Sequence, residues 1–574
     1  MVISSGVNNK KWELSQKMPD DFKDKFPEIH PVILQLFYSR GLKTQEVIDE
    51  FLLPDYSQDL HDPFIFQDMA KAVDRIYQAI EKKEKILIYG DFDADGVTSS
   101  AVLFNAFTKL GAEFLKVYIP DREKEGYSLH KKAIEKFIEE GINLIVTCDC
   151  GITNKEEVEQ INQAKMDIII TDHHPTTQEL PQAYAIINPQ LPREKYPFRF
   201  LAGVGVAFKL IQALLKDERC LIPNKESFEK WILDLVAIGT ITDVMPLLGE
   251  NRTLVKYGLV VLNKTSNIGL KALITQAGLT LGALDTWSIN FQIGPRINAA
   301  GRVSHAKDAL QLLLETDQEK INDLAIHLNS LNTKRQNTVD KIVKDIRKSI
   351  GEEIKDKIII ACGEDWPAGL LGIIAGGLMD KYFRPVIALS IRKEETSIHG
   401  RGRSIQGFDL AKVLEKFHHY FSHYGGHAKA CGFTLKDKNN LEIFIKELIQ
   451  LANNELKDED MCPKLLIDAE VSLSEVDWSL YDELKKLEPF GQNNNCPNFL
   501  VSNVKLDNIE SVGKTSQHSR LIIEKRKMIY FNGNQKITEL KIGDKIDAVF
   551  QLSVNQWNGQ QELQMKIVDI RKNN

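Results

Sequence analysis

Short apolar runs alternate with helical patterns between about residues 85 and 264, and this alternation predicts a doubly wound α/β domain with a parallel sheet. Four runs, at 86–89, 144–147, 168–171 and 231–233, are rich in aliphatic residues and stop at polar groups, which is typical of buried parallel strands. Residues 97–110, 130–140 and 154–164 have the spacing of crossover helices between them.

The rest of the chain divides into further parts by its pattern. We expect an N-terminal helical extension over 1–65 and the first α/β domain over 66–265. A helical connection over 266–350 includes a long periodic stretch at 319–350; a helical subdomain of the first domain is the alternative. Residues 351–455 predict a second, smaller α/β domain, with strands at 357–361 and 385–390 around a helix at 370–381. Short alternating runs over 465–574, with turn signals at 531–534 and 557–560, predict a β-barrel of the oligonucleotide-binding (OB) kind.

Acidic and histidine residues follow each of the four apolar runs. They are Asp91, Asp93 and Asp95, then Asp149, then Asp172, His173 and His174, and finally Asp234 with Asp243 further on. Open α/β sheets bind ligands at the carboxyl ends of their strands, and carboxylates gathered there repel one another unless cations lie between them. Oxygen ligands with one or two imidazoles suit Mn²⁺ or Mg²⁺ better than structural zinc. A single strand-end acid is usually only a solvated loop residue, but four sets together predict a two-metal site for phosphoryl displacement.

Composition limits the classes of protein that fit this pattern. A hydrophobic content of 43% and a charged content of 27% are those of a globular protein, and no apolar stretch is long enough to cross a bilayer. The N-terminus has no signal-peptide pattern, and the seven cysteines never occur as Cys-x-x-Cys, so we expect reduced thiols in a cytoplasmic protein. The net charge of −7 argues weakly against a non-specific nucleic-acid coat protein but not against a nucleic-acid enzyme, since metal-binding carboxylates lower the formal charge.

Four ordered motifs resemble one known family. Residues 91–96, 147–151 and 172–174 are similar to the first three motifs of the Asp-His-His (DHH) phosphoesterase superfamily, and 233–246 is similar to the fourth. Within that superfamily the chain most resembles the RecJ-type exonucleases specific for single-stranded DNA, over nearly its whole length.

The resemblance implies a set of metal ligands. The matching positions are Asp93, Asp95, Asp149, His173 and Asp234, and Asp91, Asp172, His174 and Asp243 complete the expected catalytic set. Asp149 would bridge two Mn²⁺ or Mg²⁺ ions. Tyr89 departs from the wider superfamily, whose phosphatases have a histidine at this position, and Asp91 could supply the missing oxygen.

Arginine- and glycine-rich segments of the second half offer groups for phosphate. Alone, such segments are more often surface turns, although 425–427 could form an anion-binding nest of backbone amides. The resemblance implies phosphate contacts in a DHH-associated domain, and the expected residues are Arg122, Arg296, Arg302, Arg401, Arg403, Ser404, Gly426 and His427. Arg122 and Arg403 would grip a terminal 5′ phosphate, and Arg401 stands where the family usually has serine.

Three other patterns predict no metal or nucleotide site. His419, His423 and His427 lack an acid or cysteine to complete a metal set, and we interpret them as a solvated helix end. Residues 513–515 lack the first glycine of a nucleotide loop, and 203–205 are a weak dinucleotide signal. The aromatic residues of the barrel are more often core than DNA-stacking groups.

These expectations combine into one functional hypothesis. The resemblance implies a metal-dependent 5′→3′ exonuclease that degrades single-stranded DNA to 5′-mononucleotides in recombinational and mismatch repair. Single-stranded DNA is the expected partner, with a single-stranded-DNA-binding protein and a helicase as further partners and no membrane. The enzyme alternative cleaves short oligoribonucleotides or cyclic dinucleotides, and its members usually lack the barrel. The non-enzyme alternative is a binding module that has lost its metal ligands, which the complete motifs here disfavour.

Overall fold

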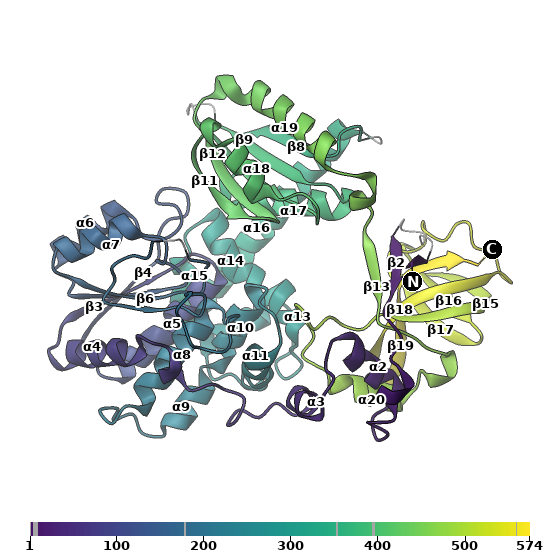
Figure 1. Cartoon of the computed structure of the whole chain (residues 1–574), viewed down its shortest axis with the longest axis horizontal. Helices are drawn as coiled ribbons and strands as arrows, with labels where there is room; N and C mark the ends of the chain where they lie inside the picture. The colour runs from purple at the N-terminus through teal and green to yellow at the C-terminus, as the bar shows by residue number, and fades with distance from the viewer. Residues whose placement is uncertain are drawn as a thin grey trace. The chain divides into compact units, whose positions relative to one another are not determined.

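The chain forms two compact units, each built from separated parts of the sequence (Figure 1). A computed structural model describes residues 2–3, 10–176, 179–351, 354–392, 397–557 and 559–573. The first unit comprises Met1–Leu53, Leu456–Phe490 and Asn495–Asn574, and the second comprises Pro54–Glu455 with Gly491–Asn494. The expected helical extension at the N-terminus therefore belongs with the C-terminal barrel rather than standing alone.

A five-stranded parallel sheet, in the order β4-β3-β5-β6-β7, forms the centre of the second unit. Its strands are β3 (Lys85–Gly90), β4 (Phe114–Tyr118), β5 (Leu144–Cys148), β6 (Asp167–Thr171) and β7 (Ala185–Ile187). The helices around it are α4 (Met69–Glu81), α5 (Ala94–Lys109), α6 (Lys131–Glu140), α7 (Lys155–Gln163) and α8 (Gly203–Lys216). Along β3, Ile86 and Ile88 enter the core formed with α4, α5 and α8, whereas Leu87 and Tyr89 pack with α6 and α7. Both faces of the sheet are covered, so the predicted doubly wound domain is confirmed.

The fourth apolar run is helical, which corrects the prediction of a strand at 231–233. Trp231 ends α9 (Lys225–Trp231), and Leu233 begins α10 (Leu233–Thr242). Helix α10 lies among α5, α8 and α11 (Gly249–Leu262), and every residue from Leu233 to Ile241 is buried. A helix buried on all sides shows no apolar–polar periodicity, so a short apolar run cannot distinguish it from a strand. The sequence also gave no prediction for the short edge strand β7.

The helical connection belongs partly to each α/β layer. Its elements are α12 (Ile268–Gln276), α13 (Thr286–Ser288), a π-helix (Ile289–Ile293), α14 (Gly294–Val303), α15 (Lys307–Leu314) and α16 (Gln318–Ile350). The first half of α16 buries Ile321 and Leu328 in the core of the parallel-sheet layer. Its last turns bury Ile342 and Ile346 in the core of the second layer. The long helix thus joins two cores, as the periodicity at 319–350 predicts.

The second α/β layer is a mixed sheet in the order β11-β12-β10-β9-β8. Its elements are β8 (Ile359–Glu364), α17 (Leu371–Tyr382), β9 (Val386–Ile391), β10 (Ile398–Arg403), α18 (Leu410–Lys416), β11 (Phe421–His427), β12 (Ala430–Leu435) and α19 (Leu441–Glu455). Strand β8 pairs with β9 in parallel, and the other pairs are antiparallel. His423 and His427 lie on the edge strand β11 and His419 lies in a preceding 3₁₀ turn, so the interpretation of a helix end is wrong.

The first unit contains the barrel. Strands β14 (Ala469–Glu470), β15 (Phe499–Val512), β16 (His518–Ile523), β17 (Arg526–Tyr530), β18 (Lys545–Trp557) and β19 (Gln560–Lys572) form one sheet, which closes through pairing of β15 with β18. The predicted hairpin at 557–560 is confirmed by the pair Trp557–Gln560, although Asn558 itself lies outside the described residues. The one at 531–534 is wrong, because β17 pairs with β16 and β19 rather than with the next strand.

The N-terminal segment completes this unit. It contributes β1 (Val2–Ile3), β2 (Lys11–Leu14), α1 (Asp20–Lys23), α2 (Pro31–Ser39) and α3 (Gln45–Leu52), which join β13 (Lys464–Ile467) and α20 (Trp478–Lys485). Strand β2 pairs in parallel with β13. Trp12 of β2 is fully buried, donates its indole N–H to Asp569 at 2.9 Å, and lies under the guanidinium of Arg571.

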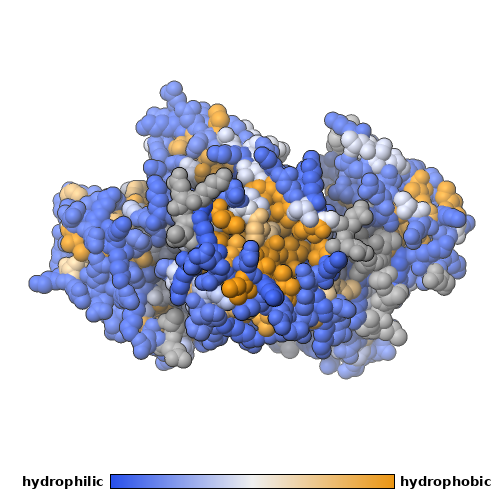
Figure 2. All heavy atoms as spheres, turned by 90° about the horizontal axis from the view of Figure 1, so that it is seen from above, coloured by the Kyte–Doolittle hydropathy of each residue, from blue (hydrophilic) through white to orange (hydrophobic). Residues whose placement is uncertain are grey.

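One face of the molecule is mostly polar. Figure 2 shows hydrophilic side chains over most of one face, with apolar side chains gathered in its middle. Among the helices of the described ranges, none is both long enough and apolar enough to span a membrane.

Candidate metal centre

The loop after β3 brings three carboxylates to the carboxyl end of the sheet. Asp93 is the N-cap of α5, and its Oδ1 accepts the backbone N–H groups of Asp95 at 2.9 Å and Gly96 at 3.1 Å. A Cβ atom on Gly96 would lie 2.5 Å from the carbonyl oxygen of Asp91, so only glycine lets the loop close this tightly. The side chain of Asn298, on α14, accepts the N–H of Ala94 and ties the helical connection to this loop.

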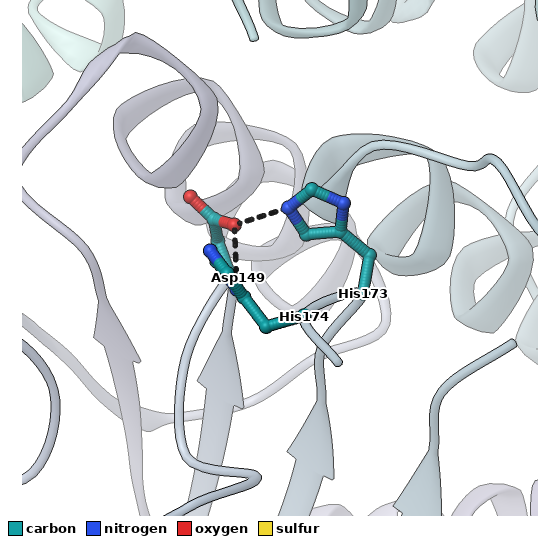
Figure 3. Close-up of side chains that lie close together, drawn as sticks. All are labelled: Asp149, His173 and His174. Atoms are coloured by element: carbon teal, nitrogen blue, oxygen red, sulfur yellow. Dashed lines mark ion pairs between the residues drawn. The ribbon is translucent and has the colours of Figure 1, made fainter. Parts of the chain in front are cut away.

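The loops after β5 and β6 add Asp149 and the two histidines (Figure 3). Asp149 has a positive φ of 63°, a conformation that aspartate adopts more readily than most residues. Its Oδ1 lies 3.1 Å from Nε2 of His173 and 3.9 Å from Nδ1 of His174. Asp172 faces the other way and accepts the N–H groups of His173 and Ile152 together with Nδ1 of His174 at 2.8 Å. Asp172 therefore organises the turn that presents the histidines and does not point its oxygens into the centre.

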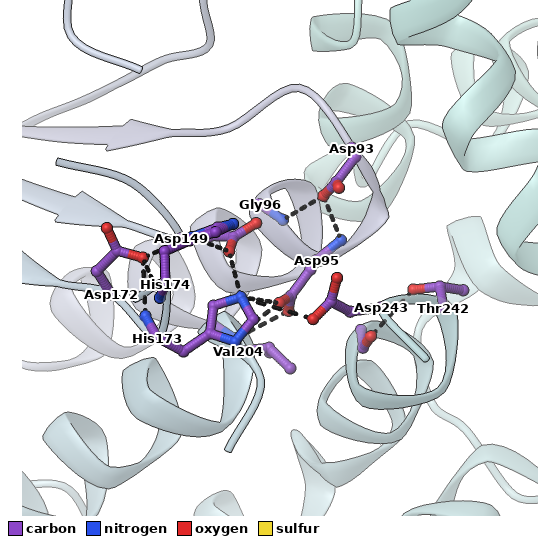
Figure 4. Close-up of polar contacts among 12 residues, drawn as sticks. Asp93, Asp95, Gly96, Asp149, Asp172, His173, His174, Val204, Thr242 and Asp243 are labelled. Carbon is purple, nitrogen blue, oxygen red and sulfur yellow. Dashed lines mark hydrogen bonds and ion pairs between the residues drawn. The ribbon is translucent and has the colours of Figure 1, made fainter. Parts of the chain in front are cut away.

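Helix α10 supplies the last carboxylate through its C-terminal end (Figure 4). Asp243, the C-cap residue of α10, places Oδ2 3.5 Å from Nε2 of His173. Asp95 Oδ2 lies 3.8 Å from the same nitrogen. Within the described residues, three sets of side chains hold ligand atoms within 4.8 Å of one another, and they are Asp149–His173–His174, Asp95–His173–Asp243 and Asp91–Asp93–Asp149. Asp149 and His173 each belong to two sets. The two oxygens of Asp149 could be shared between two ions, whereas the single lone pair on Nε2 of neutral His173 could serve one.

Four buried atoms of this centre have no hydrogen-bond partner among the described residues. They are Oδ1 of Asp91, Oδ1 of Asp149, Nε2 of His173 and Oδ2 of Asp243. Buried polar atoms are almost always paired, so four unpaired ligand atoms converging on one place fit bound cations. The donors are carboxylate oxygens and imidazole nitrogens, the set that Mn²⁺ and Mg²⁺ prefer.

Asp234 lies outside this centre, which corrects the ligand set implied by the resemblance. It is buried in the first turn of α10, at the opposite end of the helix from Asp243. Its Oδ2 accepts the hydroxyl of Thr265 at 2.5 Å, and its Oδ1 accepts the N–H of Leu235. The fourth motif contains both acids. Because they lie at opposite ends of one helix, only Asp243 is close enough to contact the histidines.

Burial and charge repulsion raise the proton affinity of the carboxylates in the metal-free centre. Burial and the neighbouring carboxylates raise the pKa of Asp91, Asp149 and Asp243 well above the usual range, and that of Asp95 to about 7. Burial and the adjacent His174 lower the pKa of His173 to about 4, so its imidazole is neutral and free to ligate at neutral pH.

His174 responds in the opposite sense to its surroundings. Burial disfavours its charged form, but the hydrogen bond and the charge of Asp172 outweigh burial and raise the pKa of His174 to about 9. Cation binding must therefore displace protons from this centre.

Tyr89 takes no part in the centre. Its ring is buried against Phe137 on the α6 side of the sheet, and its hydroxyl donates to the carbonyl of Ser128 at 2.8 Å. Asp91, two residues on, lies with Asp93 and Asp149 instead.

The charges of four arginines, Arg122, Arg302, Arg401 and Arg403, act on one another, and those of Arg122 and Arg302 also interact with the acidic centre. The pKa of Arg122 is lowered by burial and by the charges of Arg401 and Arg403, and it is raised in turn by Asp91 and Asp93. Burial and Arg122 lower the pKa of Arg302 to about 9. Arg122 also stacks over the ring of Phe92, at 4.7 Å from the ring centroid.

Strand register places the two arginines of β10 on one face of the second sheet. Arg401 pairs with Gly432 of β12, and Arg403 pairs with Ala430, which in turn pairs with His427 of β11. The side chain of Arg401 lies across Gly432, where a Cβ atom could not fit beside the guanidinium. The face therefore combines two guanidinium groups with small residues, and guanidinium groups bind phosphate oxygens through charged hydrogen bonds.

Other predicted phosphate ligands are not brought into this cluster. Arg296 donates to Asn329 and Gln292. Burial and, to a smaller extent, the charge of Arg335 lower the pKa of Arg296. Ser404 is buried and donates its hydroxyl to the carbonyl of Phe408. Gly426 lies in extended β11, where its φ of 145° and its close approach to Ala430 exclude a side chain, so the predicted amide nest is wrong.

Two contributors could not be found from the sequence. The hydroxyl of Tyr127 lies 3.1 Å from Nδ1 of His174, although its ring is about half exposed. The backbone N–H groups of Gly203 and Val204 donate to the two oxygens of Asp95. Tyr127 belongs to no recognisable motif, and the glycines at 203–205 suggested only a weak nucleotide signal.

Three known domain families match segments of the chain. Residues 85–240 match the DHH family N-terminal domain, 355–454 the DHHA1 domain and 467–569 the RecJ OB domain. The chain is 36% identical over 566 residues to the single-stranded-DNA-specific exonuclease RecJ of Bacillus subtilis, covering 97% of this chain and 70% of that protein. It is 30% identical to RecJ of Haemophilus influenzae, over 94% of this chain and 96% of that protein.

The chain belongs to the RecJ family. The crystal structure of Thermus thermophilus RecJ in complex with Mn²⁺ matches with a TM-score of 0.84 at 26% identity, covering 98% of this chain and 80% of that one. A structure of the same RecJ in complex with Mg²⁺ also matches, with a TM-score of 0.78 at 25% identity, covering 98% of this chain and 78% of that one. The expected fold, with its OB domain, and the resemblance to RecJ are confirmed. The metals of these RecJ structures are the two that the donor set favours here.

Proposed function

We propose that this protein is a metal-dependent exonuclease that degrades single-stranded DNA from its 5′ end and releases 5′-mononucleotides. The observation that carries the proposal is the adjacency of two complementary features. Unpaired carboxylate and imidazole atoms lie at the carboxyl end of the parallel sheet, and Arg122 lies within electrostatic reach of both those acids and the arginines of β10. A phosphodiester chain has the charge to occupy the position between them.

The residues that would hold the cations are those whose ligand atoms converge, namely Asp91, Asp93, Asp95, Asp149, His173, His174 and Asp243. When bound, two such cations supply an activated water and stabilise the departing oxygen of a phosphodiester. The remaining contributions come from the chain itself. Neutral His173 keeps its Nε2 available at neutral pH, and Asp172 fixes the orientation of His174.

The guanidinium cluster would orient the substrate. Arg122, Arg401 and Arg403 bind the terminal 5′ phosphate, while Arg302, held by the carbonyl of Gly369, faces the next phosphate. Charged donors in a desolvated site bind phosphate oxygens in fixed directions and stabilise the charge that develops during displacement. A terminal phosphate bound in this way sets the cleavage position one nucleotide from the end.

Labelled single strands test the proposal. A 5′-phosphorylated strand labelled at its first nucleotide should release labelled mononucleotide at once in Mn²⁺ or Mg²⁺, whereas a 3′ label should pass through a descending ladder. Chelator and Asp149→Ala should stop both. Duplex and RNA strands of the same sequence serve as substrate controls.

Two outcomes would overturn the proposal. Release of the 3′-terminal nucleotide first would reverse the polarity, and degradation by Asp149→Ala at the parental rate would remove the acidic centre from catalysis. Faster cleavage of short RNA than of DNA would favour the oligoribonucleotide alternative.

The proposed setting is the repair of DNA by recombination and mismatch correction in the cytoplasm. An exonuclease restricted to single strands requires another activity to expose them, so a helicase and a single-stranded-DNA-binding protein are the proposed partners. Stimulation of degradation of a duplex by an added helicase would support this setting, and equal rates with and without it would argue against it.

A further inference from the structure

The N-terminus of α8 touches two of the acids in the metal centre, although no metal-ligand motif includes it. The N–H of Gly203 donates to Oδ2 of Asp95 at 2.7 Å, and the N–H of Val204 donates to Oδ1 at 2.8 Å. These amides belong to the first turn of α8, where backbone N–H groups have no acceptor within the helix. Both oxygens of Asp95 are therefore fixed by one helix end (Figure 4, which labels Val204 beside Asp95).

Gly203 also makes room for Asp149. A Cβ atom at Gly203 would lie 2.6 Å from Cβ and 2.7 Å from Oδ1 of Asp149, distances that real side chains do not show. The backbone of Asp149 already has a positive φ and is held by a hydrogen bond to the carbonyl of Thr171, so it cannot retreat cheaply. Any side chain at Gly203 must move the helix, the aspartate or both.

A second glycine closes the other side of Asp95. A Cβ atom at Gly239 of α10 would lie 2.8 Å from Oδ1 of Asp95 and 2.5 Å from the hydroxyl of Thr98. Asp95 thus lies between the end of α8 and the middle of α10. Its carboxylate accepts both amides of α8 and lies against the backbone of Gly239, where a larger residue would crowd it.

The buried half of α8 holds this end in place. Lys209, one to two turns along the helix, is fully buried and lies 2.5 Å from the carboxylate of Glu250 on α11. Its Nζ also donates to Gln212 and to the carbonyl of His61. A helix anchored at this point cannot shift its first turn freely.

We propose that Gly203, Val204 and Gly239 are positioning residues, which set the orientation of Asp95 and Asp149 before any cation binds. They touch no substrate and act through the two acids. This inference rests on the proposed function only in taking the acids as metal ligands, and it is tested by metal binding without DNA.

Mn²⁺ affinity of the folded, full-length protein is the first measurement. Gly203→Ala and Gly239→Ala should each weaken Mn²⁺ binding by about 10- to 100-fold, the usual effect of losing the groups that orient metal ligands. Titration calorimetry gives the affinity, and the electron paramagnetic resonance spectrum of bound Mn²⁺ reports its coordination. Gly377→Ala is the matched control, because Gly377 is exposed on a helix with nothing within 4 Å of the added methyl.

Thermal unfolding, measured beside Mn²⁺ binding, distinguishes a positioning role of the glycines from a loss of overall stability. A merely structural role would lower the unfolding temperature of the metal-free variants while leaving the Mn²⁺ affinity and spectrum of the folded fraction as in the parent, and that result would overturn the proposal. If the unmutated protein binds Mn²⁺ but does not cleave DNA, the proposed nuclease function is wrong. The positioning role is then decided by the Mn²⁺ affinities of the glycine variants alone.

Hydrogen exchange tests the same contacts without altering a glycine. In Asp95→Ala the amides of Gly203 and Val204 lose their acceptor, so a peptide spanning 201–206 should exchange faster than in the parent. Unchanged protection would show that the helix end does not hold Asp95, even if the glycine variants fail to fold.

Discussion

Asp234 and Asp243 lie nine residues apart in one helix, and the structure gives them different tasks. We predict that Asp243→Ala loses metal binding and that Asp234→Ala loses only stability. Asp234 accepts the hydroxyl of Thr265, which is fully buried. Removing a hydrogen bond to a charged group and stranding its partner costs about 1–3 kcal/mol. Burial raises the pKa of Asp234 to about 6, so relief of that unfavourable charge offsets part of the loss, and we expect about 1–2 kcal/mol at pH 7.

The effect of Asp234 on metal binding should be small because of distance. Nine residues of α-helix span about 13 Å, so Asp234 cannot ligate the cations and acts on them only through its charge. At that separation in the protein interior, loss of the charge should weaken Mn²⁺ binding by about tenfold at most. Asp243→Ala removes one of the four unpaired ligand atoms and should weaken binding by on the order of 100-fold or more.

Calorimetric Mn²⁺ titration and thermal unfolding of the metal-free protein measure both quantities on the same samples. The reasoning fails if Asp234→Ala abolishes Mn²⁺ binding while its unfolding temperature stays parental. It also fails if Asp243→Ala binds Mn²⁺ as the parent does.

Three further predictions concern protons, phosphate and the departure at Tyr89. The folded, metal-free protein keeps a proton on Asp95 up to about pH 7, whereas the unfolded chain releases it near pH 4. The parent should therefore lose stability relative to Asp95→Asn as the pH rises from about 4 to about 7, and Mn²⁺ should restore the stability of the parent. Thermal melts in which the parent gains stability relative to the variant over this pH range would contradict the prediction. Arg401→Ser should raise KM for a 5′-phosphorylated strand about tenfold and change KM for a 5′-hydroxyl strand much less, because a charged phosphate contact contributes about 1.5–3 kcal/mol. Equal changes in KM for the two strands in steady-state kinetics would show that Arg401 does not bind the terminal phosphate. Tyr89→Phe should cost about 1 kcal/mol in denaturant unfolding, through the lost bond to Ser128, and a weaker Mn²⁺ affinity in that variant would show that the tyrosine contributes to the centre.

Much of the parallel-sheet layer could be predicted because its strands are short and buried on both faces. The runs ending at Tyr89, Thr147 and Thr171 are strands, and the acids after them meet at one edge. The run before Asp234 has the same composition but is part of a fully buried helix. Composition alone cannot distinguish a buried strand from a fully buried helix. The choice of Asp234 as a metal ligand came from the family resemblance, which did not distinguish it from Asp243.

Contacts that depend on tertiary packing could not be predicted. The glycines at 203 and 239 are remote in sequence from Asp95, and only the fold brings their backbones against its carboxylate. Gly425, Gly426 and His427 have the composition of a turn, but pairing with β12 extends them into an edge strand. The cluster of Arg122 with the β10 arginines joins residues almost 300 positions apart, and only the family resemblance, not the pattern of residues, pairs Arg122 with Arg403.

The pairing of β2 with β13 affects the order in which the chain can fold. Trp12 precedes its partners Asp569 and Arg571 by more than 550 positions in the chain. During translation Trp12 therefore lacks both partners until the whole metal-binding unit, which lies between them in the sequence, has been synthesised. A fragment beginning near Leu456 would lack the tryptophan and carry an open strand edge at β13, so recombinant production of the barrel requires the segment before Leu53 as well.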